Sequence, residues 1–406
     1  MKKLFLVYIA YYLLLALFDA TNSSSQGTWT QKADFGGGIR NGAVGFSIGK
    51  KGYIGTGWDG SINYQDLWEW DQTTNIWTQK ADFGGGTRSW SSAFSIGTKG
   101  YIVSGSNGSG PYTFYNDIWE WDQSTNTWML KANFSATGRF SSIAFSIGLK
   151  GYMGTGNYFN GSSWIAYKDF WEWDQTSDTW TQKANFVTAT TGAVGFSIGS
   201  KGYVLTADTS NNFWEWNQTT NLWVQKANFG GVARGGMAGF SIGTQGFVGC
   251  GEDNLKHNDF WEWNQTTNSW IQKANFGGTA RNRPVGFPIG TFGYMGTGAE
   301  GIYVPTKDFW EYCDTCIVGV NETENQISIY VFPNPFSTQT TFSINGQLKM
   351  GNGKYIMYDA FGKEVKKLSI VNFPFSIERG GLPNGVYFYQ ITEKEKSMAT
   401  GKLIIQ

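Results

Sequence analysis

Residues 68–75 read "WEWDQTTN", and close copies of this phrase recur along the 406-residue chain. Four copies follow, which are "WEWDQSTN" from residue 119, "WEWDQTSD" from 171 and "WEWNQTTN" from 214 and 261. A sixth instance begins at residue 310 as "WEYCDTCI" and then departs from the pattern. The phrase returns every 43–52 residues, which indicates a repeat protein in which each repeat is one supersecondary unit.

Each repeat contains four short segments of strand-forming sequence. In the first repeat these are "AVGFSIG" (43–49), "KGYIGTG" (51–57), "DLWEWD" (66–71) and "IWTQKADF" (76–83). They are rich in aromatic and β-branched residues, are bounded by Gly, Asn or Asp, and show no helical periodicity. Four short antiparallel strands in a repeat of this length are typical of the blades of a β-propeller.

The fourth segment of the repeat predicts how the ring closes. Its "W-x-Q-K-A" pattern occurs, with minor variation, at Trp29, Trp77, Trp128, Trp180, Trp223 and Trp270. One copy therefore precedes the first repeat, and none follows the last. We predict an all-β fold, a six-bladed β-propeller over residues 26–318 in which Thr28–Ala33 supplies the outer strand of the last blade and leaves no open edge.

Several details of the repeat resemble the kelch family. These details are a "GTG" at the end of the second strand (55–57, 154–156, 296–298), an aromatic residue seven positions before a Trp, as in Trp70 and Trp77, and an Arg before the first strand. This Arg is found at Arg40, Arg88, Arg139, Arg234 and Arg281. The resemblance implies a kelch-type propeller. The Gly-rich runs are not dinucleotide-binding loops, because no helix follows them.

The N-terminus reads "MKKLFLVYIAYYLLLALFDATNSSSQ", in which two lysines precede an apolar run and then small polar residues. This pattern predicts a secretory signal peptide over residues 1–25. The apolar run is short for a membrane span, and no other segment approaches spanning length. We therefore expect an exported protein without a membrane span once the signal is removed.

The repeat stops before residue 327, and residues 327–406 read as about seven short strands of a small Ig-like β-sandwich. "PNPF" (333–336), "YDAFGKEV" (358–365), "LPNGVYFYQI" (382–391) and the terminal "GKLIIQ" resemble the type IX secretion sorting domain of Bacteroidetes-type bacteria. The resemblance implies that the type IX machinery recognises this domain and that the protein is secreted or held on the outer cell surface. "GVNETENQ" (319–326) is the expected linker.

Composition excludes several classes of partner and cofactor. The formal net charge is zero and no Lys/Arg stripe occurs, which argues against nucleic acid. The single histidine, His257, excludes sites built from several imidazoles. Cys313 and Cys316 are suited to a local bridge, with Cys250 as a buried thiol. A zinc site from these residues is disfavoured, because His257 and Cys313 are expected at opposite ends of a strand. We expect no metal and no cofactor.

The loops indicate which face of the propeller has a function. The "QTTN" turns and the Gly-flanked turns between the first two strands barely vary. The loops between the second and third strands all differ, and they span residues 58–65, 106–116, 157–168, 208–211, 252–258 and 299–307. A constant scaffold with one diversified face, the variable face, favours recognition. The alternative is that these loops drift without function.

Two sets of residues are candidate ligand contacts. The long loops present Trp58, Tyr112, Tyr115, Trp164 and Tyr303 among short polar residues, which suits a sugar ring or a protein surface, unless these rings pack inward. The innermost strands begin at Gly42, Trp90, Ser141, Gly192, Gly236 and Arg283. Trp90 and Arg283 depart from this ring of small residues, and Arg283 is suited to hold a carboxylate or phosphate.

Three functions remain open. The first is a non-catalytic binding module for a glycan or a protein. The second is a sialic-acid (N-acetylneuraminate) epimerase like six-bladed kelch enzymes, whose carboxylate site the repeated arginines and Arg283 would supply. The third is a purely structural adhesion element. We predict no catalytic residue, because the repeated Arg and the Glu of each "WEW" are required in every blade and are therefore more consistent with structural roles.

Overall fold

The computed structural model describes residues 27–108, 110–207, 210–314, 329–344, 349–393 and 396–406. The predicted signal peptide (1–25), the predicted linker (319–326) and Cys316 lie outside these residues. The chain divides into two compact units, Met1–Ile317 and Val318–Gln406. Among the described residues, no helix has the length and apolar character needed to cross a membrane.

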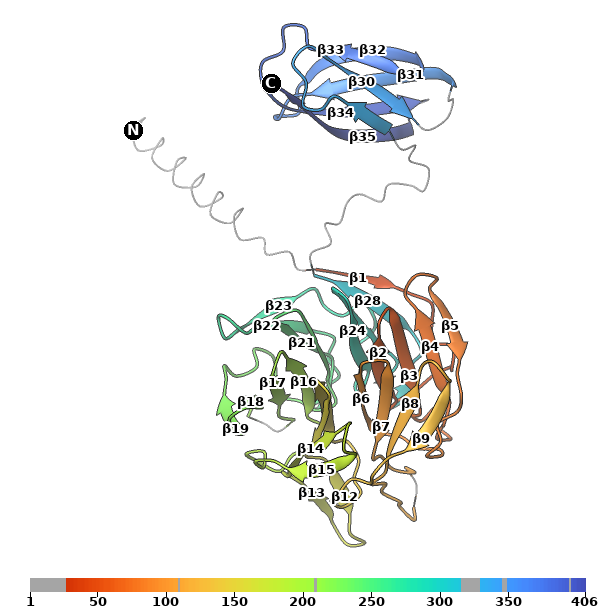
Figure 1. The fold of residues 1–406 in the computed structure, drawn as a ribbon, viewed down its shortest axis with the longest axis vertical. Helices are drawn as coiled ribbons and strands as arrows, with labels where there is room; N and C mark the ends of the chain where they lie inside the picture. Colours follow the sequence, from red (N-terminus) through yellow and green to blue (C-terminus); the bar gives the residue numbers. More distant parts are fainter. Residues whose placement is uncertain (1–26, 109, 208–209, 315–328, 345–348, 394–395) are drawn as a thin grey trace, which may run out of the picture. The chain divides into compact units, whose positions relative to one another are not determined.

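Six four-stranded antiparallel sheets, called blades here, form the described part of the first unit (Figure 1). Their innermost strands contact one another in a closed cycle, which makes the unit a β-propeller. From the centre outwards, the first three blades are β2 (Val44–Ile48), β3 (Lys51–Gly55), β4 (Leu67–Asp71) and β5 (Ile76–Gln79); β6 (Ser92–Ile96), β7 (Lys99–Val103), β8 (Ile118–Asp122) and β9 (Thr127–Leu130); and β10 (Ile143–Ile147), β11 (Lys150–Gly154), β14 (Phe170–Asp174) and β15 (Thr179–Gln182).

The other three blades follow the same order. They are β16 (Val194–Ile198), β17 (Lys201–Leu205), β18 (Phe213–Asn217) and β19 (Leu222–Gln225); β20 (Ala238–Ile242), β21 (Gln245–Gly249), β22 (Phe260–Asn264) and β23 (Ser269–Lys273); and β24 (Val285–Ile289), β25 (Phe292–Gly296), β28 (Phe309–Cys313) and β1 (Thr28–Gln31). Two further hairpins lie in the variable loops of the third and sixth blades, β12 (Asn157–Phe159) with β13 (Trp164–Ala166) and β26 (Ala299–Glu300) with β27 (Val304–Pro305). The sequence did not predict these hairpins.

The N-terminal strand completes the last blade, as predicted. In Figure 1, β1 lies beside β28, and the two strands pair in antiparallel register from Thr28 opposite Cys313 to Gln31 opposite Trp310. The indole N–H of Trp29 also donates to the Ala274 carbonyl at 3.1 Å. The outer edge of the sixth blade is therefore covered by the start of the chain.

Neighbouring blades approach each other so closely that one position needs glycine. A Cβ atom on Gly100 in the second blade would lie 2.3 Å from the ring of Phe46 in the first. The same contact closes the ring, because a Cβ on Gly52 would lie 2.6 Å from Phe287 of the sixth blade. The Phe of "GFSIG" thus packs on the Gly of the next blade's "KGY", which explains why both residues recur.

The phrase "WEWDQTTN" is constant because most of its residues make a defined contact. Asp71 accepts hydrogen bonds from the backbone N–H groups of Thr73 and Thr74 and so forms the turn. Asn75 has a φ of 57° and accepts from the Trp70 indole and from the backbone of the preceding blade. Gln72 donates at 2.8 Å to the Tyr294 hydroxyl, also in the preceding blade. The phrase is therefore both a turn and an inter-blade joint.

The sixth copy of the phrase departs from the pattern at the position that contacts the preceding blade. The residue it would contact in the fifth blade differs as well. In the phrase from residue 310, Asp314 occupies the place of the glutamine, and the fifth blade has Phe247 where the others have the accepting tyrosine. Asp314 instead pairs with Lys273 of the fifth blade at 2.7 Å. An ion pair thus replaces the Gln–Tyr hydrogen bond at this one interface.

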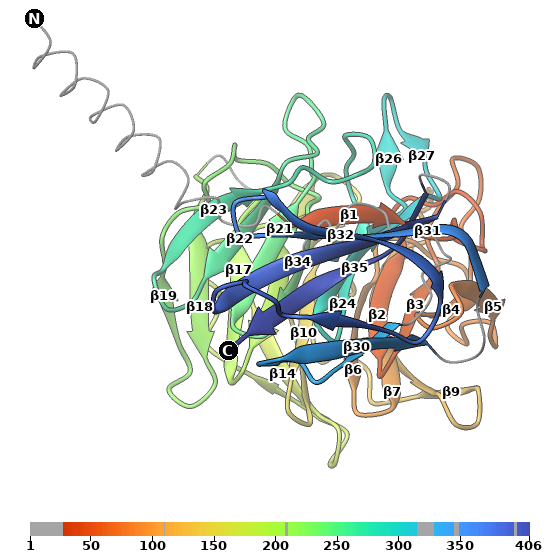
Figure 2. The same ribbon diagram turned by 90° about the horizontal axis from the view of Figure 1, so that it is seen from above.

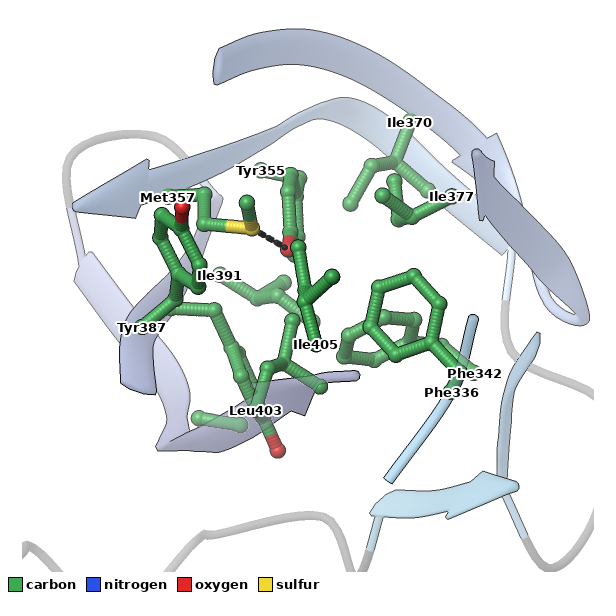
Figure 3. Packing of buried hydrophobic residues seen from close by; sticks show 12 residues of the cluster. Phe336, Phe342, Tyr355, Met357, Ile370, Ile377, Tyr387, Ile391, Leu403 and Ile405 are labelled. Carbon is green, nitrogen blue, oxygen red and sulfur yellow. Dashed lines mark hydrogen bonds between the residues drawn. The ribbon is translucent and has the colours of Figure 1, made fainter. Parts of the chain in front are cut away.

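The second unit is a β-sandwich, as predicted. One sheet contains β29 (Ile329–Phe332), β30 (Gln339–Ile344) and β33 (Phe375–Glu378), and the other contains β32 (Glu364–Asn372), β31 (Lys349–Tyr358), β34 (Gly385–Glu393) and β35 (Lys396–Ile405). Figure 2 shows β34 and β35 side by side. Strands of the second sheet are longer than the short strands we expected. Between the sheets lies an apolar core that includes Phe342, Ile391 and Leu403 (Figure 3).

Candidate ligand-binding face

The repeated arginines are internal parts of the blades. All five side chains are buried, and each forms an ion pair with the Asp that precedes the third strand of its own blade. The pairs are Arg40–Asp66, Arg88–Asp117, Arg139–Asp169, Arg234–Asp259 and Arg281–Asp308. These arginines are therefore not free to bind a ligand carboxylate, as the epimerase hypothesis would require of them.

In three blades an aromatic ring from the variable loop covers this arginine. The Arg88 guanidinium carbon lies 3.7 Å from the centre of the Tyr115 ring and 4.8 Å from that of Phe83. Tyr64 and Tyr167 cover Arg40 and Arg139 in the same way, at 3.3 and 4.2 Å. One face of the Tyr115 ring is thus occupied by a structural cation–π contact, so only the rest of this partly exposed side chain is available to a ligand.

The fourth blade has lost both members of this ion pair. Thr190 stands where the other blades have arginine, and Asn212 stands where they have aspartate. Thr190 is buried and its backbone N–H donates to the Tyr167 carbonyl at 3.2 Å. A buried arginine without its aspartate, or the reverse, would leave an uncompensated charge, which explains why the two changes occur together.

The glutamates of "WEW" are also held within the scaffold. In five blades the Glu accepts a hydrogen bond from the tyrosine of "KGY", as Glu172 does from Tyr152 at 2.7 Å. Lys183, directly after the outer strand β15, lies 3.3 Å from the same carboxylate. Burial opposes ionisation of Glu172, but the bonds from Tyr152 and Lys150 and the charge of Lys183 outweigh it, so its pKa is lowered.

The six residues that we expected to begin the innermost strands lie two positions before them and form a rim around the propeller axis. Each has a positive φ, between 52° and 71°. Five inter-blade hydrogen bonds join them, each from a backbone N–H to the carbonyl of the equivalent residue in the preceding blade. The bonded pairs are Trp90–Gly42, Ser141–Trp90, Gly192–Ser141, Gly236–Gly192 and Arg283–Gly236.

The structure brings together the two rim residues that break the sequence pattern. The Arg283 guanidinium lies 5.3 Å from the centre of the Trp90 ring, across Gly42. The Trp90 indole N–H is buried and has no hydrogen-bond partner among the described residues. Burial lowers the pKa of Arg283, and the nearby Tyr303 and Glu252 partly offset this effect. A cation and an unused donor therefore meet at the axial opening.

Arg283 also lines a cavity of about 360 Å³ formed by the fourth, fifth and sixth blades. Tyr303, Glu252 and Asn282 line the same cavity. Asn282 is 5% exposed and donates to the Glu252 carboxylate, while its amide oxygen has no partner among the described residues. The sequence did not single out Glu252 or Asn282. A comparison of the residue directly after each repeated Arg does not mark position 282, because the first blade also has an asparagine there, Asn41.

Aromatic rings continue from the rim across the loops of the second and third blades. The Phe140 ring lies 5.7 Å from that of Trp90 and 5.5 Å from that of Trp164, and Tyr112 lies 5.6 Å from Trp164. Tyr112 and Trp164 are 46% and 50% exposed. Phe140 was missed by the sequence analysis, although it is the one aromatic residue at a position otherwise occupied by Asn, Ser, Thr or Gly.

The other two predicted contacts lie apart from this aromatic cluster. Trp58 is half-buried and pairs through its backbone with Asn41. Tyr303 is 58% exposed, and the Lys256 ammonium lies 5.1 Å from its ring centre. All seven predicted residues are at least partly exposed, and among them Tyr115 has one ring face against Arg88.

No group of three or more His, Cys, Asp or Glu side chains suited to a metal occurs within the described residues. Cys250 is a free, fully buried thiol whose burial raises its pKa to about 12. Cys313 is disulfide-bonded. His257 lies 3.0 Å from the Asp253 carboxylate.

Comparison with known proteins supports the reading of both units. Residues 330–406 match the family model described as "Secretion system C-terminal sorting domain", so the type IX machinery exports the protein to the cell surface or the extracellular space. No curated protein matches the chain. The solved structure titled "Structure of YjhT" has a TM-score of 0.60 and 15% identity, covering 68% of this chain and 95% of that one. This likeness shows the propeller fold alone.

Proposed function

We propose that the protein is a kelch-type, six-bladed propeller that binds a glycan or a protein through its variable face and has no catalytic activity. The contact between Trp90 and Arg283 at the rim carries this proposal. Both side chains stand at the axial opening, beside a cavity lined by Glu252, Asn282 and Tyr303. Trp58, Tyr112 and Trp164 extend the accessible aromatic surface around them.

The backbone supports a functional role for these two residues. Their φ values are 55° and 52°, in the left-handed region, where glycine occupies three of the six equivalent positions. A side chain in this conformation costs about 1–2 kcal/mol relative to glycine. Strain of this kind persists where a side chain is needed for function. Ser141 has the same conformation at the rim, so we infer a binding role for Trp90 and Arg283 from the bulk and the charge of their side chains together with this strain.

Arg283 differs from the repeated arginines in its partners. Within the described residues no carboxylate lies within ion-pair distance of its guanidinium, whereas each repeated arginine has an aspartate. A planar guanidinium with free donors suits a ligand oxygen pair. We infer that Arg283 orients the ligand and that Trp90 supplies an apolar face against it.

The experiment is a binding screen of the purified protein against glycans, polysaccharides and extracellular proteins. The Trp90→Ala/Arg283→Ala variant is measured beside a control, Lys50→Ala/Leu149→Ala, whose exposed residues lie in turns of the opposite face. We expect the rim variant to lose at least about tenfold in affinity, as for truncated hot spots, and the control to bind normally. Equal binding by both variants would contradict the proposal.

One observation keeps an enzyme as a second candidate. Arg283 and Glu252 line the same cavity, and an arginine near a carboxylate is a minimal arrangement for binding and deprotonating an acidic sugar. Interconversion of N-acetylneuraminate anomers, followed by NMR with Glu252→Gln as the control, tests this candidate. Turnover that disappears in the variant would favour the epimerase over the binding module.

A further inference from the structure

The exposed part of the aromatic cluster is a corner between two rings. Tyr112 and Trp164 lie 5.6 Å apart with their planes inclined at 64°, and about half of each side chain is exposed. Phe159 contacts both rings, with ring centres 5.9 Å from Tyr112 and 5.1 Å from Trp164, and is itself partly buried. One ring therefore offers its face while the other forms a side wall. We call this pair the aromatic corner.

The backbone holds the aromatic corner in place. Trp164 belongs to the β12–β13 hairpin, where it pairs with Phe159, and the Asn160 side chain accepts two backbone N–H groups in the turn. In the neighbouring loop, Asn107 bonds through its side chain to the Thr113 N–H and the Pro111 carbonyl. Because these hydrogen bonds hold the described residues of both loops, a ligand meets a prearranged surface at low entropic cost.

The two loops that form the aromatic corner are almost free of charge. Residues 106–116 contain no charged residue, and residues 157–168 contain only Lys168. The ionic groups beneath them, Arg139 and Asp169, are paired with each other. Exposed Ser162 and Ser163 lie in the hairpin turn next to Trp164. The aromatic corner and these serines therefore offer a ligand aromatic rings and hydroxyl groups but no charge.

The exposed area favours a small ring over a protein surface. Two half-exposed aromatic side chains present roughly 200 Å² between them, whereas a stable protein interface buries about 800 Å² on each partner. The apolar face of a pyranose ring with its equatorial hydroxyl groups matches one aromatic face and a nearby side wall in size and polarity. An uncharged sugar ring therefore fits the aromatic corner better than a protein does.

We propose that Tyr112 and Trp164 form a subsite for an uncharged sugar unit of an oligosaccharide whose chain extends to the rim at Trp90. This inference rests on the proposed binding role of the variable face. Phe140 links the two places, because its ring contacts both Trp90 and Trp164. The ligand is then a chain of several sugar units instead of a single monosaccharide.

Isothermal titration of the full chain with cello-, manno- and N-acetylchito-oligosaccharides of two to six units tests the inference. We expect at least one series to bind with an affinity that rises with chain length. Trp164→Ala and Tyr112→Ala should each lower the affinity for the longest member by about tenfold and flatten the dependence on length. Trp164→Phe, which keeps an aromatic face, should retain most of the affinity.

The control is Phe361→Ala, which removes a 96% exposed aromatic side chain from the second unit and should leave binding unchanged. Absence of binding by the unmodified protein to every series would overturn the inference, as would an unchanged length dependence in both corner variants. If the corner variants bind normally while Trp90→Ala/Arg283→Ala does not, the subsite is wrong and the proposed function stands. If all these variants bind as the unmodified protein does, both fail.

Discussion

The two terminal nitrogens of Arg139 donate to the two carboxylate oxygens of Asp169, and this pair lies inside a blade, away from the propeller axis. The Arg139 side chain is fully buried, while that of Asp169 is 18% exposed. The pair also joins the loop that enters the blade to the start of its third strand. Its equivalents recur in four other blades, and in the fourth blade both members are replaced.

The first prediction concerns this ion pair. Asp169→Asn leaves a buried guanidinium without its counter-charge and should cost about 3–5 kcal/mol of unfolding free energy. Arg139→Thr/Asp169→Asn copies the fourth blade, and we expect it to cost less than the two single changes together, with a coupling of about 1–3 kcal/mol. Urea unfolding of the unmodified protein, of Asp169→Asn, of Arg139→Thr and of the double variant gives the four free energies of the double-mutant cycle. Strictly additive costs would show that the paired loss in the fourth blade has another cause.

The second prediction separates the side chain of Arg283 from its backbone. Arg283→Gly and Arg283→Ala both remove the guanidinium, so they should be equally poor at binding. Because φ is 52°, the glycine variant should be more stable than the alanine variant by about 1 kcal/mol. The control is the same pair of substitutions at Ser95, which lies inside a regular strand. There the alanine variant should be more stable than the glycine variant. An alanine variant at position 283 as stable as the glycine variant would argue against strain.

The third prediction concerns acid stability. The pKa of Glu172 is lowered in the folded protein, so its contribution to stability is fully present above its ordinary value of about 4.5 and is lost as the pH falls below it. The gap in Tm between the unmodified protein and Glu172→Gln should therefore narrow between pH 6 and pH 3. Asp82→Asn, which removes an exposed carboxylate, is the control variant measured over the same pH range. A Tm difference that widens as the pH falls would contradict the lowered pKa of Glu172 in the folded protein.

The fold could be predicted from the sequence because the repeated phrase has few possible structures. Asp71 makes a contact that depends on the chain forming that turn, and Gln72 and Asn75 make contacts that depend on a neighbouring blade being present. Counting the copies of one strand was then sufficient to place Thr28–Gln31 beside the last blade. The hairpins within the loops escaped prediction, because their sequences have no repeat for comparison.

The site could be predicted only as far as the backbone determines it. Trp90 and Arg283 were placed at the rim because their positions in the repeat are fixed, but their contact depends on side-chain direction. The same limitation explains Tyr115, which turns back onto Arg88. The role of Phe140 arises only when the loops of two blades meet, and no single repeat contains that information.

The pairing of β1 with β28 imposes an order of events on folding. Trp29 and Ala274, which share a hydrogen bond, are 245 positions apart in the chain. A chain that emerges N-terminus first must therefore keep its first strand unpaired until the last blade has been delivered, and contacts of such long range form slowly. The ring closes only when the whole repeat region is on the same side of a membrane, because both strands of the closing pair must be present there.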